Sequence, residues 1–249
     1  MSREKDLRPL LIVYGAGELG ARVAQRWVKQ GGRAIGVTLS TKRHGDLAGF
    51  VIQPVLKDHF RVPTEAASWV LATPGSQNQS EAIRQLSGHD LTGRAVLCGS
   101  TAIFRREETE RKRRAHEMER VFSTWAGDRG VVLRLGGLYR EGRGPFNSLK
   151  NGRIPPPAPG SRALPLVHYD DAATAVLNAV TLSRADSWYA VASQPVPTRG
   201  EFYELASKQL GVDVPLTDHQ MDMPDFELSR TREAILVDME WPDWRGAVL

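Results

Sequence analysis

The sequence predicts an α/β protein built on a doubly wound parallel sheet, with a small C-terminal lobe on the substrate side. Three observations support this fold class. A glycine-rich turn at residues 15–20 follows a strand-like apolar run near the N-terminus. Strand-like runs then alternate with helical stretches as far as residue 135, which is typical of a parallel sheet with helices on both faces. After residue 140 the chain becomes rich in glycine and proline, which predicts the lobe.

The first strand is predicted at residues 10–13 and is followed directly by a helix. Leu19, Val23 and Trp27 recur at helical spacing, on the face that should cover the strand. Gly31-Gly32 ends this helix, and a second strand at residues 34–38 follows at the distance that a right-handed crossover requires. Strand, helix and second strand therefore form one βαβ unit.

The turn between the first strand and its helix predicts a nucleotide-phosphate site of the Rossmann type. Gly15 permits a tight turn, Gly17 lets a pyrophosphate approach the backbone, and Gly20 allows the helix to pack closely on the strand. Free N–H groups in the first helical turn, where Glu18 and Leu19 stand, favour a phosphate together with the helix dipole. The alternative interpretation is a glycine-rich turn without a ligand.

The tip of the second strand favours NADP(H) over NAD(H). NAD sites usually carry an Asp or Glu here for the ribose 2′-hydroxyl, but this chain has Ser40, Thr41, Lys42 and Arg43. Two hydroxyls and two cations suit a 2′-phosphate. The alternative is an exposed basic turn, since Lys and Arg are common on solvated loops.

Four further strands are expected, at residues 50–55, 68–72, 94–98 and 130–135, with helical stretches at 81–86 and 107–126. The segments that follow parallel strands gather at one edge of the sheet, where ligands bind. The expected cofactor contacts at this edge are Ala72, Thr73, Pro74 and Gly99. The hydroxyls of Ser100 and Thr101 can bond a ribose or a substrate carbonyl. Their alternative role is a helix cap or turn.

Residues 141–164 are predicted to be a loop over the site, because their glycines and prolines cannot sustain a long regular element. A strand at 164–168, an acid-capped helix from Asp170, a strand at 188–192 and a helix at 201–210 closed by Gly211 complete the pattern. We find no repeat and no linker. Residues 1–249 are therefore expected to form a single NAD(P)-binding domain, with a substrate-side insert at roughly 141–164 and a tail at roughly 194–249.

The composition predicts a soluble cytoplasmic protein with a full core. Of the 249 residues, 41% are apolar, and Cys98 is the one cysteine, which excludes a disulfide framework. No run approaches the length of a membrane span, and the N-terminal apolar stretch is too short for a signal peptide. We expect a small-molecule substrate and no membrane partner; an oligomer is possible, but its state is not assigned.

The net charge of +4 does not predict a nucleic-acid partner. The densest basic stretch, Arg105 to Arg120, is interleaved with five glutamates, as in a solvated helix. A phosphate-tracking surface would instead carry one sign of charge and aromatic platforms. The six histidines are scattered along the chain, so no metal site is expected.

Four segments in order carry a family resemblance: Gly-Ala-Gly-Glu-Leu-Gly at 15–20, Leu-Cys-Gly-Ser-Thr-Ala-Ile-Phe at 97–104, the segment from Leu133 to Arg143, and Val-His-Tyr-Asp-Asp-Ala-Ala at 167–173. Together they resemble the extended short-chain dehydrogenase/reductases, the branch of NAD-dependent epimerases and dehydratases. The short substrate region and the Trp-Pro-Asp-Trp-Arg ending are most similar to a compact, atypical subgroup whose members are mostly of unassigned function.

The resemblance implies a catalytic Ser or Thr, a Tyr, and a Lys four residues after the Tyr. Ser100 matches the first role. The predicted helix, aligned through Glu119, offers Arg111 and Ala115 in place of Tyr and Lys. The Tyr-x-x-x-Lys dyad is therefore missing, and an oxyanion formed by hydride transfer needs another proton donor or stabilising group.

Four residues are candidates for the remaining roles. Tyr139 follows the sixth strand and is the candidate catalytic phenol, or else it lines the pocket. Arg140 and Arg143 could bind a substrate carboxylate or phosphate. His168 could titrate near neutral pH beside the substrate, or else it packs or bonds the backbone.

The sequence therefore predicts an NADP(H)-binding oxidoreductase, or an epimerase- or dehydratase-like protein, acting on a small polar metabolite. The hydride chemistry would be the cofactor's own. The alternative is a non-catalytic NAD(P)(H) sensor or partner-binding protein that has lost the Tyr and Lys.

Overall fold

The structure is a computed structural model that describes residues 9–65, 67–89, 91–104, 108–183, 185, 187–217, 239–241 and 243–247. Residues 218–238 of the expected tail lie outside these ranges. So do residue 107 of the helix expected at 107–126 and residues 105 and 106 of the basic stretch. Within them, no helix has the length and apolar content needed to cross a membrane.

The centre of the molecule is a seven-stranded sheet whose neighbouring strands all pair in parallel. Its order is β10-β6-β5-β4-β1-β2-β3. The strands are β1 (Leu10–Tyr14), β2 (Arg33–Thr38), β3 (Gln53–Leu56), β4 (Ala67–Leu71), β5 (Ala95–Ser100), β6 (Gly130–Leu135) and β10 (Trp188–Val191). The chain reverses its direction of winding between β1 and β4, and ligands bind beyond the strand ends at such a point. The predicted doubly wound Rossmann-type sheet is confirmed.

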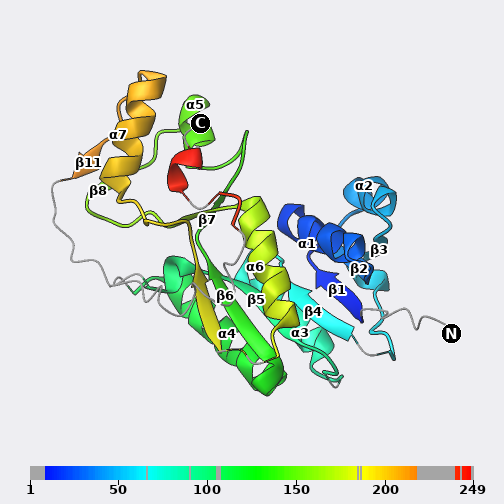
Figure 1. Cartoon of the computed structure of the whole chain (residues 1–249). Coiled ribbons are helices and arrows are strands. Elements are labelled where there is room, and N and C mark those ends of the chain that lie inside the picture. Colours follow the sequence, from blue (N-terminus) through cyan, green and yellow to red (C-terminus); the bar gives the residue numbers. More distant parts are fainter. Residues whose placement is uncertain are drawn as a thin grey trace.

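Helices cover both faces of this sheet (Figure 1). Helices α1 (Glu18–Lys29) and α6 (Tyr169–Thr181) contact each other on one face, and α3 (Ser76–Leu86) contacts α4 (Glu110–Ala126) on the other. The short α2 (His44–Gly49) lies beside β3. In α1 the predicted apolar face is buried, since Leu19, Val23 and Trp27 all pack in the core.

Strand β1 contributes side chains to two hydrophobic cores, because successive side chains of a strand point to opposite faces of the sheet. Leu11 and Val13 pack with residues of α1 and α6. Leu10, Ile12 and Tyr14 pack with residues of α3 and α4. The whole strand is buried, which explains why it reads as a continuous apolar run rather than an alternating one.

A third core forms the predicted C-terminal lobe, away from the sheet (Figure 1). Its elements are α5 (Pro145–Lys150), β8 (Ala158–Pro159), α7 (Arg199–Leu210), β11 (Leu216–Thr217) and a 3-10 turn at Trp244–Ala247. Strand β7 (Gly137–Tyr139) pairs in parallel with β9 (Leu166–His168) and connects this lobe to the sheet. The N-terminus of α7 carries a capping box between Thr198 and Glu201, which satisfies first-turn donors.

Several predicted boundaries differ from the structure. The third strand begins at Gln53 rather than residue 50, because α2 occupies the segment before it and its apolar neighbours Phe50 and Val51 are exposed. The helix predicted at 81–86 begins earlier, at Ser76. The charged helix begins at Glu110, where the Thr109 side chain accepts a hydrogen bond from the Lys112 N–H. Within 141–164 the loop contains the short α5, which has a proline in its first turn.

Candidate functional site

A large cleft lies at the carboxyl edge of the sheet, where the sequence predicted the site. Its volume is about 1150 Å³, which is ample for a dinucleotide and a small substrate. Its walls come from the glycine turn after β1, the segments after β4, β5 and β6, one face of α4, and the loop over the site. The predicted site residues that line it are Gly17, Glu18, Leu19, Ala72, Thr73, Pro74, Gly99, Ser100, Thr101 and Arg143.

Different structural features explain why each of the three motif positions carries a glycine. Gly15 adopts φ +96°, a conformation that favours glycine. A Cβ on Gly20 would lie 2.4 Å from the carbonyl oxygen of Gly15, so close packing excludes any side chain there. A Cβ on Gly17 would meet no protein atom closer than 4.0 Å. The protein itself thus leaves room for a side chain at Gly17, and this empty space faces the cleft.

The basic tip of β2 lies beside the glycine turn but outside the cleft lining. The N–H groups of Gly15 and Ala16 donate to the Val37 carbonyl at 3.0 and 2.9 Å, which ties the two strand ends together. Ser40, Thr41 and Lys42 are exposed and Arg43 is half-buried. Lys42 and Arg43 belong to a 3-10 turn, Thr41–Arg43, that begins directly after Ser40.

Ser100 and Thr101, at the end of β5, use their hydroxyls differently. The Ser100 oxygen accepts a hydrogen bond from the Ala102 N–H at 3.2 Å, which leaves its own O–H proton available to a ligand. The Thr101 hydroxyl donates to the Leu135 carbonyl at 3.3 Å. Thr101 is also buried. Because its hydroxyl proton is used in this bond to the fold, it is less available to a ligand. Ser100 is therefore the better hydrogen-bond donor of the two for a substrate oxygen.

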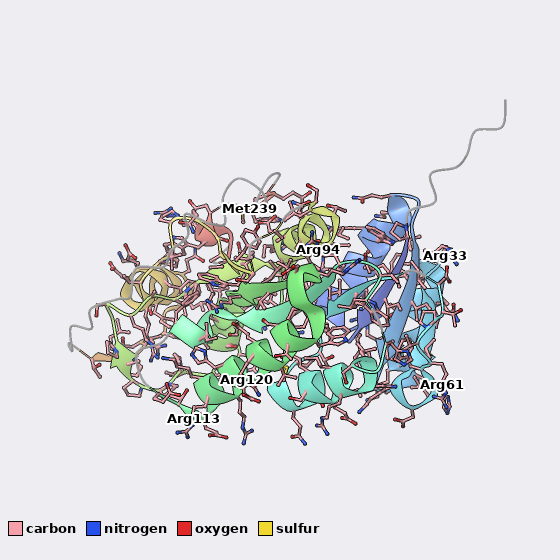
Figure 2. All side chains as sticks on the ribbon, turned by 90° about the horizontal axis from the view of Figure 1, so that it is seen from below. Arg33, Arg61, Arg94, Arg113, Arg120 and Met239 are labelled. Carbon is pink, nitrogen blue, oxygen red and sulfur yellow. The ribbon has the colours of Figure 1, made fainter. Side chains whose placement is uncertain are left out.

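One face of α4 forms a wall of the cleft. Arg111, Ala115 and Glu119 stand on this face at helical spacing. Glu119 is held by Arg134 of β6 at 2.7 Å, and its Oε1 would lie 3.5 Å from a Cβ on Gly99. No ion pair or hydrogen bond joins Arg111 to another side chain within the described ranges. Another face of α4 packs in the core through Met118, Phe122 and Ala126, and Arg113 and Arg120 project from the helix into solvent (Figure 2).

Tyr139 and His168 do not line the cleft. Tyr139 is buried in the core of the lobe, and burial raises its pKa to about 12. The His168 ring contacts the rings of Tyr139, edge to face, and Trp241, at centroid distances of 5.2 and 4.8 Å, and its Nδ1 accepts a hydrogen bond from the Asp170 N–H at the start of α6. Burial lowers the pKa of His168, which favours the neutral ring. These placements give no support to the acid role expected for Tyr139 or the substrate contact expected for His168; they match the packing alternative for His168.

The two arginines expected at the substrate lie together at the start of α1. Arg143 lines the cleft, whereas Arg140 does not. Both pair with the carboxylate of Glu18, Arg143 at 3.0 Å. Burial alone would raise the pKa of Glu18, but hydrogen bonds and charge from these two arginines outweigh it and lower the pKa. Glu18 is therefore ionised at neutral pH.

Among the cleft residues that the sequence did not predict, Tyr169 and Gln79 carry polar groups at the cleft wall. Tyr169, the first residue of α6, lines the cleft with its ring 5.3 Å from the Arg143 guanidinium, and burial raises its pKa. Gln79 of α3 is buried at the cleft wall, where its side-chain amide donates to the Cys98 carbonyl at 2.9 Å. The positions of both side chains depend on how α6 and α3 pack on the sheet. Of the two, only Tyr169 could have been suspected from the local sequence, since it directly precedes the predicted start of a helix.

Neither cysteine nor metal chemistry is favoured by the described residues. Cys98 lines the cleft, but burial raises its pKa to about 12, so the thiol stays protonated and is a poor nucleophile. Within the described ranges, no three His, Cys, Asp or Glu side chains meet as potential metal ligands.

Comparison with known proteins gives a fold but no close relative. No protein-family model matches the sequence, and no curated protein matches it significantly. A functionally unknown conserved protein from Silicibacter pomeroyi superposes with a TM-score of 0.74 at 18% identity, over 96% of both chains.

Two further solved structures are similar to this chain and hold nucleotide cofactors. The Bordetella bronchiseptica enzyme WbmG, in complex with NAD and UDP, gives a TM-score of 0.68 at 15% identity, covering 100% of this chain and 95% of that one. Human epimerase family protein SDR39U1, with NADPH, gives 0.63 at 15% identity, covering 83% and 82%. The chain therefore shares the fold of these structures, a parallel sheet with helices on both faces, as the sequence predicted.

Proposed function

We propose that the protein binds NADP(H) in the cleft and transfers hydride between the cofactor and a small polar metabolite. The observation that carries the proposal is the space at Gly17. Close packing and backbone conformation account for Gly20 and Gly15, but a side chain at Gly17 would find 4.0 Å of clearance from the protein. A glycine is needed there if a ligand, rather than the protein, approaches the backbone.

The residues present fit a dinucleotide diphosphate. The N-cap of α1, Gly17, has no side-chain cap, so first-turn N–H groups remain available to phosphate oxygens. Solved structures with the same fold hold NAD or NADPH by their descriptions. The preference for NADP(H) rests on the hydroxyls and cations from Ser40 to Arg43, of which only Arg43 is half-buried, and which suit a 2′-phosphate.

The chain's own contribution to the reaction is a positioned hydrogen bond. Bound nicotinamide gives or accepts the hydride. The free proton of Ser100 can be donated to the substrate oxygen on which negative charge develops. Ala115, small and on the opposite wall, leaves room for that substrate.

Binding is tested by Gly17→Ala, because an added methyl group has room in the protein and only the ligand would meet it. We expect unchanged thermal stability and at least a tenfold weaker NADPH affinity in a titration followed by nicotinamide fluorescence. Gly45→Ala is the matched control, since a Cβ there also meets nothing within 4 Å. Equal NADPH affinity in Gly17→Ala and wild type would overturn the proposed site.

Cofactor choice is tested separately. Wild type should bind NADPH more tightly than NADH, and the double change Lys42→Ala with Arg43→Ala should remove most of that difference. Lys29→Ala, an exposed lysine at the end of α1, should leave it unchanged. Equal affinities in wild type would remove the role given to the β2 tip.

A second candidate function is a non-catalytic NAD(P)(H) sensor or partner-binding protein. One observation favours it: the cleft face of α4 presents Arg111 and Ala115, where the resembling family carries Tyr and Lys. A chain that binds NADPH but oxidises none of it across a panel of small carbonyl compounds would favour this candidate. Turnover that depends on Ser100 would exclude it.

A further inference from the structure

A tight turn after β7 presents two guanidinium groups to the start of α1. Arg140 and Arg143 exchange backbone hydrogen bonds, with N–O distances of 3.1 and 2.9 Å, and Gly142 between them has φ +71°. The short turn thus fixes the spacing of the two side chains. Both reach the same carboxylate, Glu18, across more than a hundred residues of sequence.

Glu18 lies in the first turn of α1, next to the N–H groups expected to hold the diphosphate. Its side chain is 17% exposed and lines the cleft. Arg143 Nη1 donates to Glu18 Oε2 at 3.0 Å, and Arg140 Nε donates to Glu18 Oε1. Arg143 therefore stands in the cleft beside the place that the backbone prepares for an anion, and Arg140, which does not line the cleft, is held on the same carboxylate.

The positive charges of the arginines around Glu18 exceed its single negative charge. Arg22, the third cation near Glu18, is closer to Asp170, at 2.7 Å compared with 3.7 Å to Glu18. Within the described ranges, Arg140 and Arg143 share the single carboxylate of Glu18. These ion pairs leave one guanidinium in excess, although the charge of Glu141 also acts on Arg140. The excess charge adds to the positive end of the α1 dipole.

Arg143 is also accessible enough to meet a second partner. Its side chain is 56% exposed, and its guanidinium lies 5.3 Å from the ring centroid of Tyr169, which lines the same cleft. An exposed ion pair contributes little free energy. A diphosphate with two negative charges therefore competes well with Glu18 for these arginines.

We infer that Arg140 and Arg143 form the side-chain half of the diphosphate site, and that Glu18 holds them in place and competes with the diphosphate for them. This inference rests on the proposed cofactor function and changes the sequence-based assignment of both arginines from substrate to cofactor. The backbone of the glycine turn supplies one half of the site. The turn after β7 supplies the other and brings the loop over the cofactor.

The test compares NADPH affinities of Arg140→Gln, Arg143→Gln and Glu18→Gln with wild type. We expect each arginine variant to bind NADPH about tenfold more weakly, and Glu18→Gln to bind it several-fold more tightly, because the competing carboxylate is gone. Arg120→Gln is the control, because Arg120 pairs with Glu117 at 2.7 Å on the solvent side of α4. Thermal melts establish that each variant is folded.

A ligand fragment without a diphosphate separates the two halves of the cofactor. Adenosine 2′-phosphate should bind Arg143→Gln as tightly as wild type. If both arginine variants bind NADPH normally while wild type binds it, the inference is overturned and the proposed function stands. If they leave NADPH affinity unchanged but raise the KM of a substrate, the arginines belong to the substrate. If wild type itself fails to bind NADPH, the proposed function fails first, and this inference with it.

Discussion

The guanidinium of Arg134 lies 2.7 Å from the carboxylate of Glu119, and each side chain is only 13% exposed. The rings of Phe104 and Trp188 stand 5.0 and 4.0 Å from the same guanidinium. The pair joins β6 to α4 directly beneath the cleft. It therefore fixes the helix face that carries Arg111 and Ala115 relative to the end of β5.

Breaking this pair should destabilise the fold. We expect Glu119→Gln to lower the free energy of unfolding by roughly 3 kcal/mol, because it leaves a mostly buried guanidinium without its counter-charge. Urea denaturation measures the loss. Glu117→Gln removes a carboxylate from an exposed pair on the same helix, at 2.7 Å from Arg120, and should change stability by less than about 0.5 kcal/mol. Equal losses in the two variants would contradict this account.

Removing the Ser100 hydroxyl should affect turnover and not folding. If a substrate is found, Ser100→Ala should lower kcat by about 100-fold, the usual effect of losing one donor to a developing oxyanion. NADPH affinity and melting temperature should stay close to wild type. Ser123→Ala, an exposed serine of α4, is the control. Unchanged kcat would remove Ser100 from the chemistry.

Gly20→Ala should behave differently from Gly17→Ala. The added Cβ would lie 2.4 Å from the Gly15 oxygen and 2.8 Å from Val13 Cγ1, so α1 must move away from β1. We expect a loss of about 2 kcal/mol in stability from overpacking, together with weaker NADPH binding. Denaturation curves of the two variants decide this; a stable Gly20→Ala would show that the helix moves without cost.

An acidic substrate should depend on Arg111. Of the cleft-lining carboxylates, Glu110 pairs with Arg114 at 2.7 Å, and Glu18 and Glu119 are paired as described above. We therefore expect Arg111→Gln to raise the KM of a carboxylate- or phosphate-bearing substrate about tenfold. The KM of a neutral carbonyl compound should stay the same. A parallel rise for both compounds would indicate a general distortion of α4.

The pH dependence of stability should contain a contribution from Asp171. This carboxyl is 1% exposed, and burial raises its pKa above the ordinary 3.8, although the N–H groups of Glu240 and Trp241 donate to it. Between 3.8 and the raised value the folded chain holds the proton that the unfolded chain has lost, so stability falls as pH rises.

Asp171→Asn removes that titration. Measured by urea denaturation at a series of pH values, the stability of the wild type relative to the variant should decline as pH rises through this window. A constant difference, or one that grows with pH, would mean that the two backbone donors outweigh burial.

Local patterns were sufficient for the sheet and for most of the cofactor side. The apolar run before Gly15 and the hydroxyls at the ends of β4 and β5 mark buried strands and their ends, so Thr73 and Ser100 were predicted at the cleft. Strand β3 was placed too early because Phe50 and Val51 are apolar, although the structure exposes them at the end of α2. Propensity cannot detect such an exposed apolar turn.

The substrate side depends on contacts between distant segments. Pairing of β7 with β9 turns Tyr139 into the lobe rather than the cleft. The attachment of Arg140 and Arg143 to Glu18 joins two turns that are far apart in the sequence. A single sequence records neither relationship, because nothing in the spacing of these residues specifies which neighbour each side chain will meet.

The lobe core has a consequence for the order in which the chain can fold during synthesis. It buries Tyr139 together with Trp244, whereas β1 to β6 are complete by Leu135. On the ribosome, six of the seven central strands can therefore leave the exit tunnel and pair while the lobe still awaits its last aromatic residue. If the glycine turn binds the proposed cofactor, binding can precede completion of the lobe, and cofactor supplied during translation should raise the yield of folded protein.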